Sequence, residues 1–422
     1  MRVSILLTDL TASGGAQRQA MLLAHWLGEL GHAATLYAVR YCPEDCFPKL
    51  AGSLDIRAVE VLSPSAASAR NRSRHHGILA GARRHLWETH RLAELVAQEP
   101  CDILNAHVRA ATRSAVECKR RTGAPVVWMC DDARNWEEPG YRVYYAPPVQ
   151  WLFDRVMARL ERPVVREIDR IIALDHRVKN ILESYYGRPT EVIRSGLDAG
   201  SFSKRSETRD EIRARHEIPG GDFLLLWLGI FEPHRRIEDT LEALRVLRVL
   251  GRNDIHFLIA GSAAFAPAYF QKLKELTARY GLRDAVRFHP QAVPEAEMAE
   301  YYSAADALVY LAENQCWGLS VFEALACDLP VIVSRACGAH EVLQDRETAL
   351  LVAPRNPPEL ARAITELADS RELRDRVVRK ARAQVLDQIT WKAYAQNMLR
   401  AFEQVLGERR GDLAAARREV FA

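Results

Sequence analysis

Short apolar runs and longer segments with helical periodicity alternate along the first half of the chain. The runs Val3–Leu7 and Ala34–Ala38 predict buried strands, and Ala16–Leu30, whose apolar residues recur at helical spacing up to Gly31, predicts a helix between them. Further strands are expected at the apolar runs Asp102–His107, Pro125–Cys130, Ile171–Leu174 and Glu191–Ile193. Because strands alternate with helices, the pattern indicates a parallel, doubly wound sheet.

The alternation begins again in the second half of the chain and predicts a second sheet. Its expected strands are Phe223–Leu228, His256–Ile259, Val286–Phe288, Ala307–Tyr310 and Pro330–Val333. A chain of 422 residues suits two cores of ordinary size better than one. We therefore expect an α/β protein with Rossmann-like, doubly wound parallel-sheet domains at 1–198 and 199–388, followed by a helical segment at 389–422.

Composition and charge exclude several classes of protein. Hydrophobic residues make up 48% of the chain and charged residues 27%, which is ordinary for a globular protein, and a net charge of +3 gives no reason to expect a nucleic-acid partner. The longest strongly apolar run, Phe223–Phe231, is too short to span a membrane, and the apolar start of the chain is too short for a signal peptide. The cysteines show no zinc-ligand spacing. We expect a cytoplasmic protein with free thiols and no metal site.

One basic stretch, Arg70–Arg91, stands out from this ordinary composition. It contains six arginines and four histidines, and Glu88 is its only acidic residue. One interpretation is a solvated helix face or loop. The other is a surface that meets anionic lipid or a phosphorylated acceptor, which would place the protein at the inner face of the membrane as a peripheral protein.

Two candidate ligand-binding features follow expected strands of the first domain, at the edge where open parallel sheets bind ligands. Ser13-Gly14-Gly15-Ala16-Gln17 lies between a strand and a helix, where glycines let backbone amides approach an anion; a plain turn is the alternative. His107 ends a strand and could bond a sugar hydroxyl, or it could be a structural histidine.

The second domain has a basic pair at a similar position. Arg235 and Arg236 follow the strand that stops at Gly229. Arginine offers fixed, bidentate donors to a diphosphate, although a solvated helix start is the alternative interpretation. Cations are unfavourable at a helix N-terminus, which argues for an anion nearby.

The most informative segment is Glu313–Ser334. A loop leads to Gly318 and a helix follows, so that the amides of Gly318, Leu319 and Ser320 would point at a phosphate. Glu323 lies about one turn into this apolar helix, where a buried charge needs a partner. A ribose diol would be such a partner, and a neighbouring arginine is the alternative.

This segment resembles the signature of a large family of retaining glycosyltransferases, family 4, whose members have the GT-B fold. The family carries Glu-x7-Glu within a run similar to EGFGLxxxEAMAxGxPVVAS, and the matching residues here are Gln315–Leu319, Glu323–Ala326 and Pro330–Ser334. Segments that resemble other parts of the family are Ser13–Ala16, Asp102–His107, Val192–Asp198 and Gly338–Val342. The resemblance implies two facing domains with an interdomain cleft, and a last helix, about Trp391 to Leu406, that crosses back to the first domain.

The resemblance also implies roles for individual residues. Glu323 would hold the donor ribose, Arg235 would stand where the family has its phosphate-binding lysine, and His107 would touch the donor sugar near its reacting face. These residues are the predicted catalytic set. The predicted donor-binding set is Gly14, Gly15, Arg236, Gln315, Trp317, Gly318, Leu319 and Glu323. No essential metal is expected, because enzymes of this fold hold the diphosphate with protein groups.

The chain departs from the family pattern in the second domain at two positions. Gln315 replaces the first glutamate of the motif, so it can bond a sugar hydroxyl but carries no charge, and Glu313 could compensate. Ile230 replaces the usual arginine after the strand glycine, so Arg235 and Arg236 could share its work.

A third departure concerns the first domain. Where the family often has a histidine after the strand that ends at Cys130, this chain has Asp131 and Asp132, followed by Arg134. These residues are candidates for an acceptor site, where one carboxylate would orient or deprotonate the acceptor hydroxyl. Ordinary loop carboxylates are the alternative.

The expected function is therefore that of a retaining hexosyltransferase. It would move a sugar from a nucleoside-diphosphate-sugar to a hydroxyl of a lipid-linked or growing glycan, without a cofactor. Two alternatives remain open: an isomerase similar to nucleotide-sugar 2-epimerases, which share the two-domain cleft, and a non-catalytic sugar-nucleotide-binding homologue, which Gln315 and Ile230 make conceivable.

Overall fold

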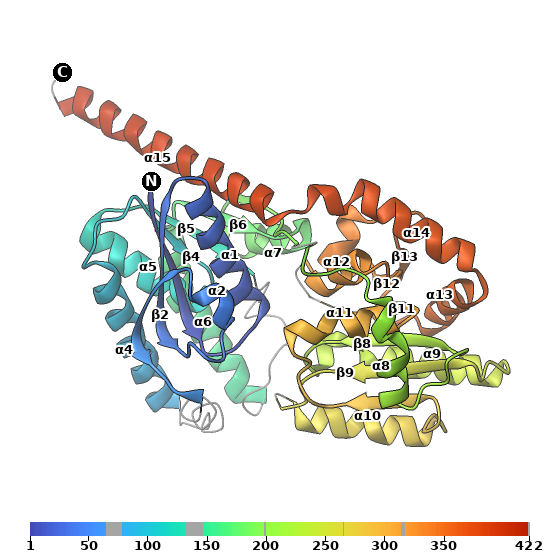
Figure 1. Cartoon of the computed structure of the whole chain (residues 1–422). Coiled ribbons are helices and arrows are strands. Elements are labelled where there is room, and N and C mark those ends of the chain that lie inside the picture. The colour runs from blue at the N-terminus through green and yellow to red at the C-terminus, as the bar shows by residue number, and fades with distance from the viewer. Residues whose placement is uncertain (65–77, 132–146, 198–199, 265, 314–316, 421–422) are drawn as a thin grey trace. The chain divides into compact units, whose positions relative to one another are not determined.

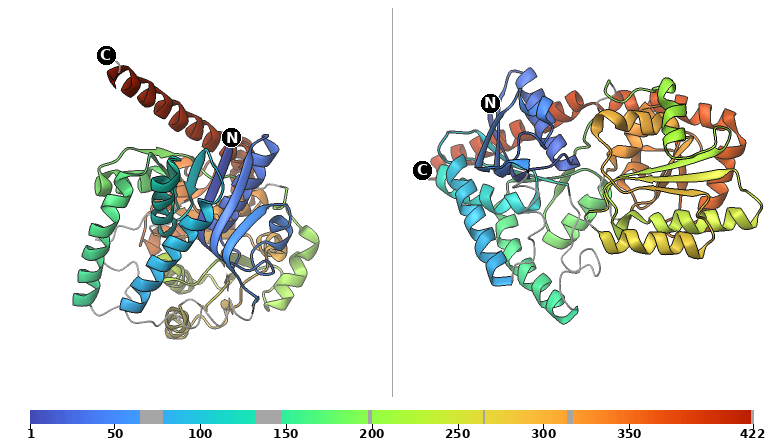
Figure 2. Two further views of the ribbon diagram at one scale, coloured as in Figure 1. Left: turned by 90° about the vertical axis from the view of Figure 1, so that its left-hand side faces the viewer. Right: turned by 60° about the horizontal axis from the view of Figure 1, so that its bottom comes forward.

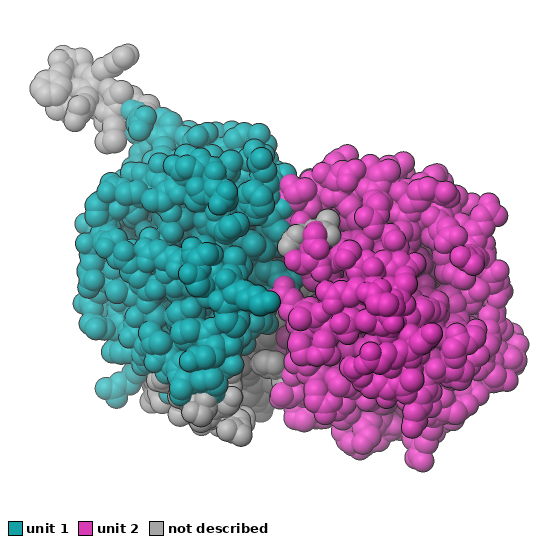
Figure 3. Space-filling view, viewed as in Figure 1, with its two compact units in different colours: residues 1–195, 391–422 teal, residues 196–390 magenta. Residues whose placement is uncertain are grey.

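The computed structural model describes residues 1–64, 78–131, 147–197, 200–264, 266–313 and 317–420. They form two compact units, coloured separately in Figure 3: unit 1 comprises Met1–Ser195 with Trp391–Ala422, and unit 2 comprises Gly196–Thr390. The predicted cleft between the domains stays a prediction.

Unit 1 contains a parallel sheet of seven strands within the described residues, in the order β3-β2-β1-β4-β5-β6-β7. The strands are β1 (Arg2–Leu10), β2 (Ala33–Tyr41), β3 (Asp55–Val61), β4 (Ile103–Ala106), β5 (Val126–Cys130), β6 (Arg170–Ala173) and β7 (Thr190–Val192). The central strands are apolar and buried along their length because helices cover both faces of the sheet. The strand order reverses between β1 and β4, and such a reversal opens a crevice for ligands at the carboxyl ends of the strands.

The helices of unit 1 include one from the far end of the chain. They are α1 (Gly15–Glu29), α2 (Pro48–Ala51), α4 (Ile78–Val96), α5 (Arg109–Thr122), α6 (Pro147–Arg166), α7 (His176–Tyr186) and α15 (Trp391–Val420). Helix α15 packs against α1 (Figure 1) and buries Tyr394, Met398 and Phe402. It begins at the expected residue but extends well past Leu406, where the sequence analysis ended it.

Unit 2 contains a second parallel sheet, with six strands in the described part of the chain, in the order β10-β9-β8-β11-β12-β13. Its strands are β8 (Phe223–Leu228), β9 (Ile255–Ala260), β10 (Val286–His289), β11 (Ala307–Tyr310), β12 (Val331–Ser334) and β13 (Leu350–Val352). The order reverses between β8 and β11. The two sheets confirm the prediction of two doubly wound, Rossmann-like domains.

Helices cover both faces of the second sheet as well (Figure 2). They are α8 (Arg209–Arg215), α9 (Ile237–Val249), α10 (Pro267–Arg279), α11 (Glu295–Ala304), α12 (Leu319–Ala326), α13 (Pro357–Asp369) and α14 (Arg371–Gln384). Short 3₁₀ helices lie at Ser206–Thr208, Pro233–Arg235, Gly338–Val342 and Leu386–Gln388. The core on one face joins Leu225, Phe257 and Ile332 of the sheet to Leu244 of α9 and Ile364 of α13.

Two close backbone approaches shape unit 2. Gly261, at φ +143°, follows β9, and a Cβ there would lie 1.7 Å from the carbonyl oxygen of Gly229. The chain leaving β8 therefore passes directly over the end of β9, which fixes the path toward Arg235. At the other end of the unit, the amide of Leu197 donates to the carbonyl of Ile389 at 3.0 Å, so the two ends of unit 2 lie side by side.

Candidate functional site

Arg235 lies at the carboxyl edge of the unit 2 sheet, at the end of the 3₁₀ helix after β8. Its Nη1 donates to Oη of Tyr310, the last residue of β11, at 2.8 Å. The Nε–H of Arg235 is buried and has no hydrogen-bond partner among the described residues. An unsatisfied buried donor costs free energy unless an acceptor arrives, so this edge of the sheet suits an anionic group.

The start of helix α12 packs on the same tyrosine. Trp317 and Gly318 both have left-handed backbone conformations, with φ of +46° and +78°. A Cβ on Gly318 would lie 3.0 Å from Cε1 of Tyr310 and 3.1 Å from Sγ of Cys337, so only glycine allows this close packing. No side chain of the described residues caps the first amides of α12, which remain available to an anion beside Arg235.

Glu323 lies on α12 and is only 3% exposed. Its carboxylate accepts a hydrogen bond from Oη of Tyr302, on α11, at 2.9 Å. Burial raises the pKa of Tyr302 well above its usual value and the Glu323 charge raises it further, so the phenol stays a proton donor. The partner of Glu323 expected from the sequence was a ribose or an arginine, and in the structure a tyrosine hydroxyl holds the carboxylate in place.

Arg236 and Glu313 take part in ion pairs within unit 2. Two nitrogens of the Arg236 guanidinium contact the Asp239 carboxylate at 2.6 and 3.1 Å, and a third contacts Glu238 at 3.3 Å. Arg355 binds Glu313 with two hydrogen bonds of 2.7 and 2.8 Å, which lower the pKa of Glu313. The contacts of Arg236 favour a structural role for this residue at the start of α9. The carboxylate of Glu313, which was expected to compensate for Gln315, is bound by Arg355.

The glycine loop of unit 1 leads directly into helix α1, whose N-terminus has no side-chain cap within the described residues. Gly14 precedes α1 in an extended conformation, no described side chain caps the helix, and a Cβ on Gly15 would have open space around it. Gln17 donates to the carbonyl oxygen of Asp9 at 3.1 Å and so ties the helix start to the end of β1. The first amides of α1 therefore offer uncapped donors to an anion, and diphosphate binding by this glycine loop stays a prediction.

His107 follows β4 and is completely buried. Its backbone amide donates to the carbonyl of Leu6 at 3.0 Å, but neither ring nitrogen has a partner in the part of the chain that the structure describes. Burial lowers the pKa of His107 to about 3, so the imidazole is neutral at physiological pH. A neutral ring offers one donor and one acceptor, which suits a sugar hydroxyl better than a phosphate.

Several predicted residues are only partly placed. Asp131 follows β5. Burial raises the pKa of Tyr394 on α15, and the charge of Asp131 raises it further. Asp132, Arg134 and Gln315 lie outside the described residues.

The indole of Trp317 is buried and stacks on Phe322, with ring centroids 4.6 Å apart. Any contribution of this residue to a ligand site would thus come from its backbone, which is also the role expected for Leu319 at the first position of α12.

Two tyrosines that organise the site were not predicted from the sequence. Tyr310 links Arg235 to Gly318, and Tyr302 holds Glu323. The available signal for Tyr310 was a hydroxyl at the carboxyl end of an apolar strand. Tyr302 gave no such signal, because it lies within α11 and its contact with Glu323 on the next helix depends on how the two helices pack.

Two further observations apply to the described residues only. No group of three His, Cys, Asp or Glu side chains is arranged to hold a metal ion. No helix combines the length and the apolar character needed to cross a bilayer.

Two Rossmann-like units of this kind define the GT-B class of glycosyltransferase fold, and solved structures agree. The fold matches that of Anabaena Alr3699/HepE in complex with UDP and glucose, with a TM-score of 0.75 and 16% identity over 96% of this chain and 100% of that one. It also matches WaaG, a glycosyltransferase involved in lipopolysaccharide biosynthesis, with a TM-score of 0.66 and 20% identity over 93% of this chain and 98% of the other.

Sequence comparisons then identify the family. Residues 13–200 match the model of Glycosyltransferase Family 4, and residues 208–384 match that of Glycosyl transferases group 1. The chain therefore belongs to the glycosyltransferases that these two family models describe.

Curated relatives include the D-inositol 3-phosphate glycosyltransferase of Thermomonospora curvata, 27% identical over 316 residues, or 71% of each chain. That of Geodermatophilus obscurus is 32% identical over 225 residues. This second match spans 50% of this chain and 48% of the relative, so the chain aligns with only about half of that protein.

Proposed function

We propose that this transferase moves a hexosyl residue from a nucleoside-diphosphate-sugar to an acceptor hydroxyl with retention of the anomeric configuration. The observation that supports this most directly is the buried, unpartnered Nε–H of Arg235 next to the uncapped start of α12 at Gly318. Together they offer one charged donor and several amides to a diphosphate. The solved structures of HepE with UDP and with UDP-glucose support a nucleotide sugar as donor.

Charge stabilisation in the transition state would be the main task of this site. As the glycosidic bond breaks, negative charge grows on the diphosphate and the sugar becomes similar to an oxocarbenium ion. Arg235 and the amides of Gly318 and Leu319 are preorganised donors for that charge, and removing one such donor typically costs about 10²–10³ in kcat. Glu323, held by Tyr302, would bind the ribose hydroxyls of the donor.

Retention would follow if the acceptor hydroxyl attacks on the face that the diphosphate leaves. In that geometry a phosphate oxygen takes the acceptor proton as the new bond forms. The neutral ring of His107 would bond a hydroxyl of the donor sugar, and the amides at Gly14 and Gly15 would bind diphosphate oxygens. Protein groups would hold the diphosphate without a metal. The roles of Gln315, and of Asp131, Asp132 and Arg134 at the acceptor, stay predictions.

The acceptor that we propose is a lipid-linked or growing glycan at the inner face of the membrane. Helices α4 and α6 both pack against α5 (Figure 2) and carry exposed apolar side chains. Those with the largest exposed fractions are Leu86 (57%), Trp87 (47%), Trp151 (59%), Leu152 (57%), Val156 (47%) and Leu160 (50%). Arg155 lies over the ring of Trp151, 4.6 Å from the centroid, and Arg84 is near Leu86 in sequence. Aromatic and apolar groups beside arginines are typical of surfaces that bind anionic membranes.

A donor screen would test the enzymatic part of the proposal. Thermal unfolding is measured with UDP-glucose, UDP-galactose, UDP-N-acetylglucosamine and GDP-mannose, because a donor at 100 times its Kd stabilises the fold by about 2.7 kcal/mol. The stabilising donor is then incubated with an acceptor panel that includes D-inositol 3-phosphate, and the anomeric configuration of the product is read by NMR. Conversion of the donor without any acceptor would favour an epimerase, and binding without turnover would favour a non-catalytic homologue.

Sedimentation with liposomes would test the membrane part. We expect the protein to sediment with phosphatidylglycerol vesicles and less with phosphatidylcholine vesicles. Replacing Trp87 and Trp151 with serine should reduce the bound fraction severalfold, whereas Val249→Ser, which removes an apolar side chain that is 78% exposed in unit 2, should not. Equal sedimentation with both lipids would contradict the proposed membrane contact.

A further inference from the structure

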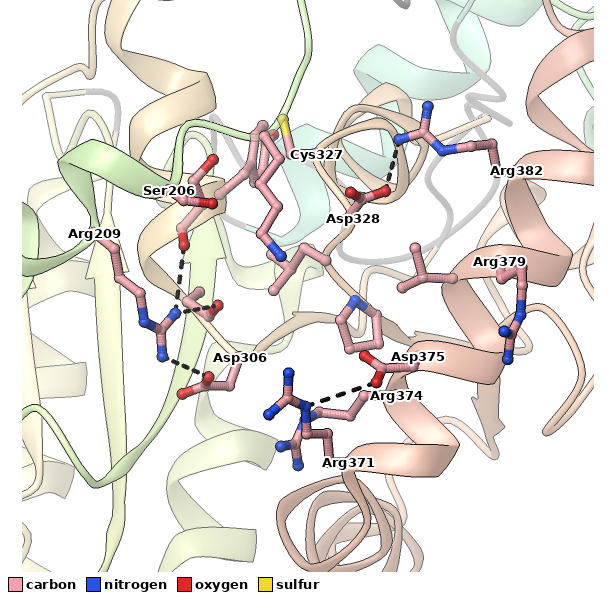
Figure 4. Close-up of a pocket in the computed structure, with 17 residues that line it drawn as sticks. Ser206, Arg209, Asp306, Cys327, Asp328, Arg371, Arg374, Asp375, Arg379 and Arg382 are labelled. Carbon is pink, nitrogen blue, oxygen red and sulfur yellow. Dashed lines mark hydrogen bonds and ion pairs between the residues drawn. The ribbon is translucent and has the colours of Figure 1, made fainter.

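A cavity of about 680 Å³ lies in unit 2, at the edge of the sheet opposite to the candidate donor site (Figure 4). Asp306, which immediately precedes β11, and Pro330, which immediately precedes β12, both line it. The parallel strands begin at this edge, whereas Tyr310 and Gly318 lie at or beyond the edge where the strands end. The cavity therefore lies at the other edge of the sheet from Arg235 and Gly318, and Tyr302, whose hydroxyl bonds Glu323, is part of its lining.

The lining of this cavity is strongly cationic. Six lysine or arginine residues line it against three aspartates. Figure 4 shows Arg371, Arg374 and Arg379 on the side formed by α14, and Arg209 of α8 on the opposite side. A volume of this size accommodates a small organic molecule, and the excess of positive charge selects an anion.

Two of the cations are already paired within the protein. Arg209 pairs with Asp306 at 2.7 Å and also donates to the carbonyl of Ala304 at the end of α11. Asp306 also binds the buried Arg213 at 2.6 Å, so it neutralises Arg209 only in part. Arg382 pairs with Asp328 at 2.7 Å.

The remaining cations carry the surplus charge. Lys204 and Arg379 line the cavity and form no ion pair or hydrogen bond with any residue that the structure describes. Arg374 donates only to neutral backbone carbonyls, those of Leu367 and Ala368. Arg371 approaches Asp375 only to 3.7 Å, and both side chains are exposed.

Helix α14 places two of these cations at its start. Arg371 and Arg374 lie in its first turn, where the helix dipole disfavours positive charge, and the last carbonyls of α13 compensate Arg374 in part. Cations placed at a helix N-terminus and around a cavity are stabilised when an anion binds between them. Apolar contacts from Leu329, Pro330 and Val378 complete the lining and suit the organic part of such an anion.

We propose that this cavity is a second binding site, which takes a small phosphomonoester. Arginine offers the paired donors that phosphate oxygens accept, and a dianionic phosphate matches the surplus charge of Lys204, Arg374 and Arg379. The phosphate could belong to a soluble metabolite or to a lipid headgroup, and the chemistry of recognition is the same for both.

Calorimetric titration of the full chain with inorganic phosphate and with glycerol 3-phosphate tests the site. Lys204→Glu and Arg379→Glu are suitable variants because neither side chain takes part in the described packing, and each should weaken glycerol 3-phosphate binding about tenfold or more. Arg376→Glu is the matched control: it makes the same charge change on α14, at an exposed position that does not line the cavity, and should change the affinity less than about twofold.

A second control separates this cavity from the donor site. Arg235→Ala should leave glycerol 3-phosphate binding unchanged, and its loss would mean that the phosphate binds at the donor site, which overturns the proposal. Absence of binding in the unmodified protein, or equal weakening by Arg376→Glu, would also overturn it. Vesicles of phosphatidylcholine with and without phosphatidic acid identify the source, since sedimentation that needs phosphatidic acid and is lost in Arg379→Glu indicates a lipid headgroup.

Discussion

Replacing Arg235 with alanine should remove most of the turnover while leaving the fold intact. In the free protein its guanidinium makes a hydrogen bond of 2.8 Å to Tyr310, so the fold should lose only about 1–2 kcal/mol. In the transition state it would face the growing charge of the diphosphate, and loss of such a donor lowers kcat about 10²–10³-fold. The effect should therefore be far larger on catalysis than on stability.

The neighbouring residue provides the matched control. Arg236→Ala makes the same change in charge, but the guanidinium of Arg236 bonds Asp239 and Glu238 at the start of α9. Its backbone also has a left-handed φ of +55°, which disfavours alanine as much as arginine. We expect a loss of about 2–3 kcal/mol in the free energy of unfolding, because the buried carboxylate of Asp239 loses its partner while Glu238 keeps Tyr269 and Lys272. The change in kcat/KM should be less than about threefold.

A third variant tests how Arg235 is positioned. Tyr310→Phe keeps the ring against Gly318 but removes the hydroxyl that accepts from Arg235, so kcat should fall about tenfold. Because the two residues act together, the double variant Arg235→Ala with Tyr310→Phe should be no worse than Arg235→Ala alone.

The assay combines initial rates with equilibrium unfolding. The donor is the nucleotide sugar that stabilises the protein in the thermal screen, and urea titration gives the free energy of unfolding of each variant. The role assigned to Arg235 is wrong if Arg235→Ala keeps kcat/KM within threefold of the unmodified enzyme. It is also wrong if Arg236→Ala loses as much activity as Arg235→Ala at unchanged stability.

Three further outcomes are expected from the packing of single residues. Tyr302→Phe removes the hydrogen bond to the buried carboxylate of Glu323 and should lower the free energy of unfolding in urea by about 1–3 kcal/mol; an unchanged midpoint would contradict that bond. The pKa of His107 is lowered by burial from 6.5 to about 3, so the unfolded chain binds a proton first as the pH falls. The free energy of unfolding should therefore drop by about 1.4 kcal/mol from this group between neutral pH and pH 5.5, and His107→Asn should flatten that part of the pH profile. Gly261→Ala should abolish soluble expression, since its Cβ would overlap a carbonyl oxygen at 1.7 Å, whereas Gly281→Ala, at φ +68° in open space, should cost only about 1 kcal/mol by thermal unfolding.

Hydrophobic periodicity was sufficient to predict the central strands of both sheets, because these strands are buried on both faces and therefore consist of continuous apolar runs. The predicted strand Ala307–Tyr310 coincides with β11, and Phe223–Leu228 coincides with β8. The strands that periodicity did not reveal are β3 and β13. Each lies at the edge of its sheet, and β3 is half exposed, so charged residues interrupt its apolar pattern.

Side-chain pairing is the part of the site that the sequence could not provide. Arg235 and Arg236 are equivalent in a list of residues, but the backbone turn directs one toward Tyr310 and the other toward Asp239. The partner of Glu323 lies on another helix, and its identity depends on tertiary packing. Local motifs therefore predicted which residues gather at the edge of the sheet, while the pairing among them required coordinates.

The backbone bridge between Leu197 and Thr390 has a consequence for protein engineering. The first and last residues of unit 2 meet, so the unit is a cassette inserted into the chain of unit 1. Insertions of this kind are well tolerated when their termini are close. Exchanging residues 196–390 for the equivalent cassette of another family member should transplant donor preference while the acceptor preference of the host remains.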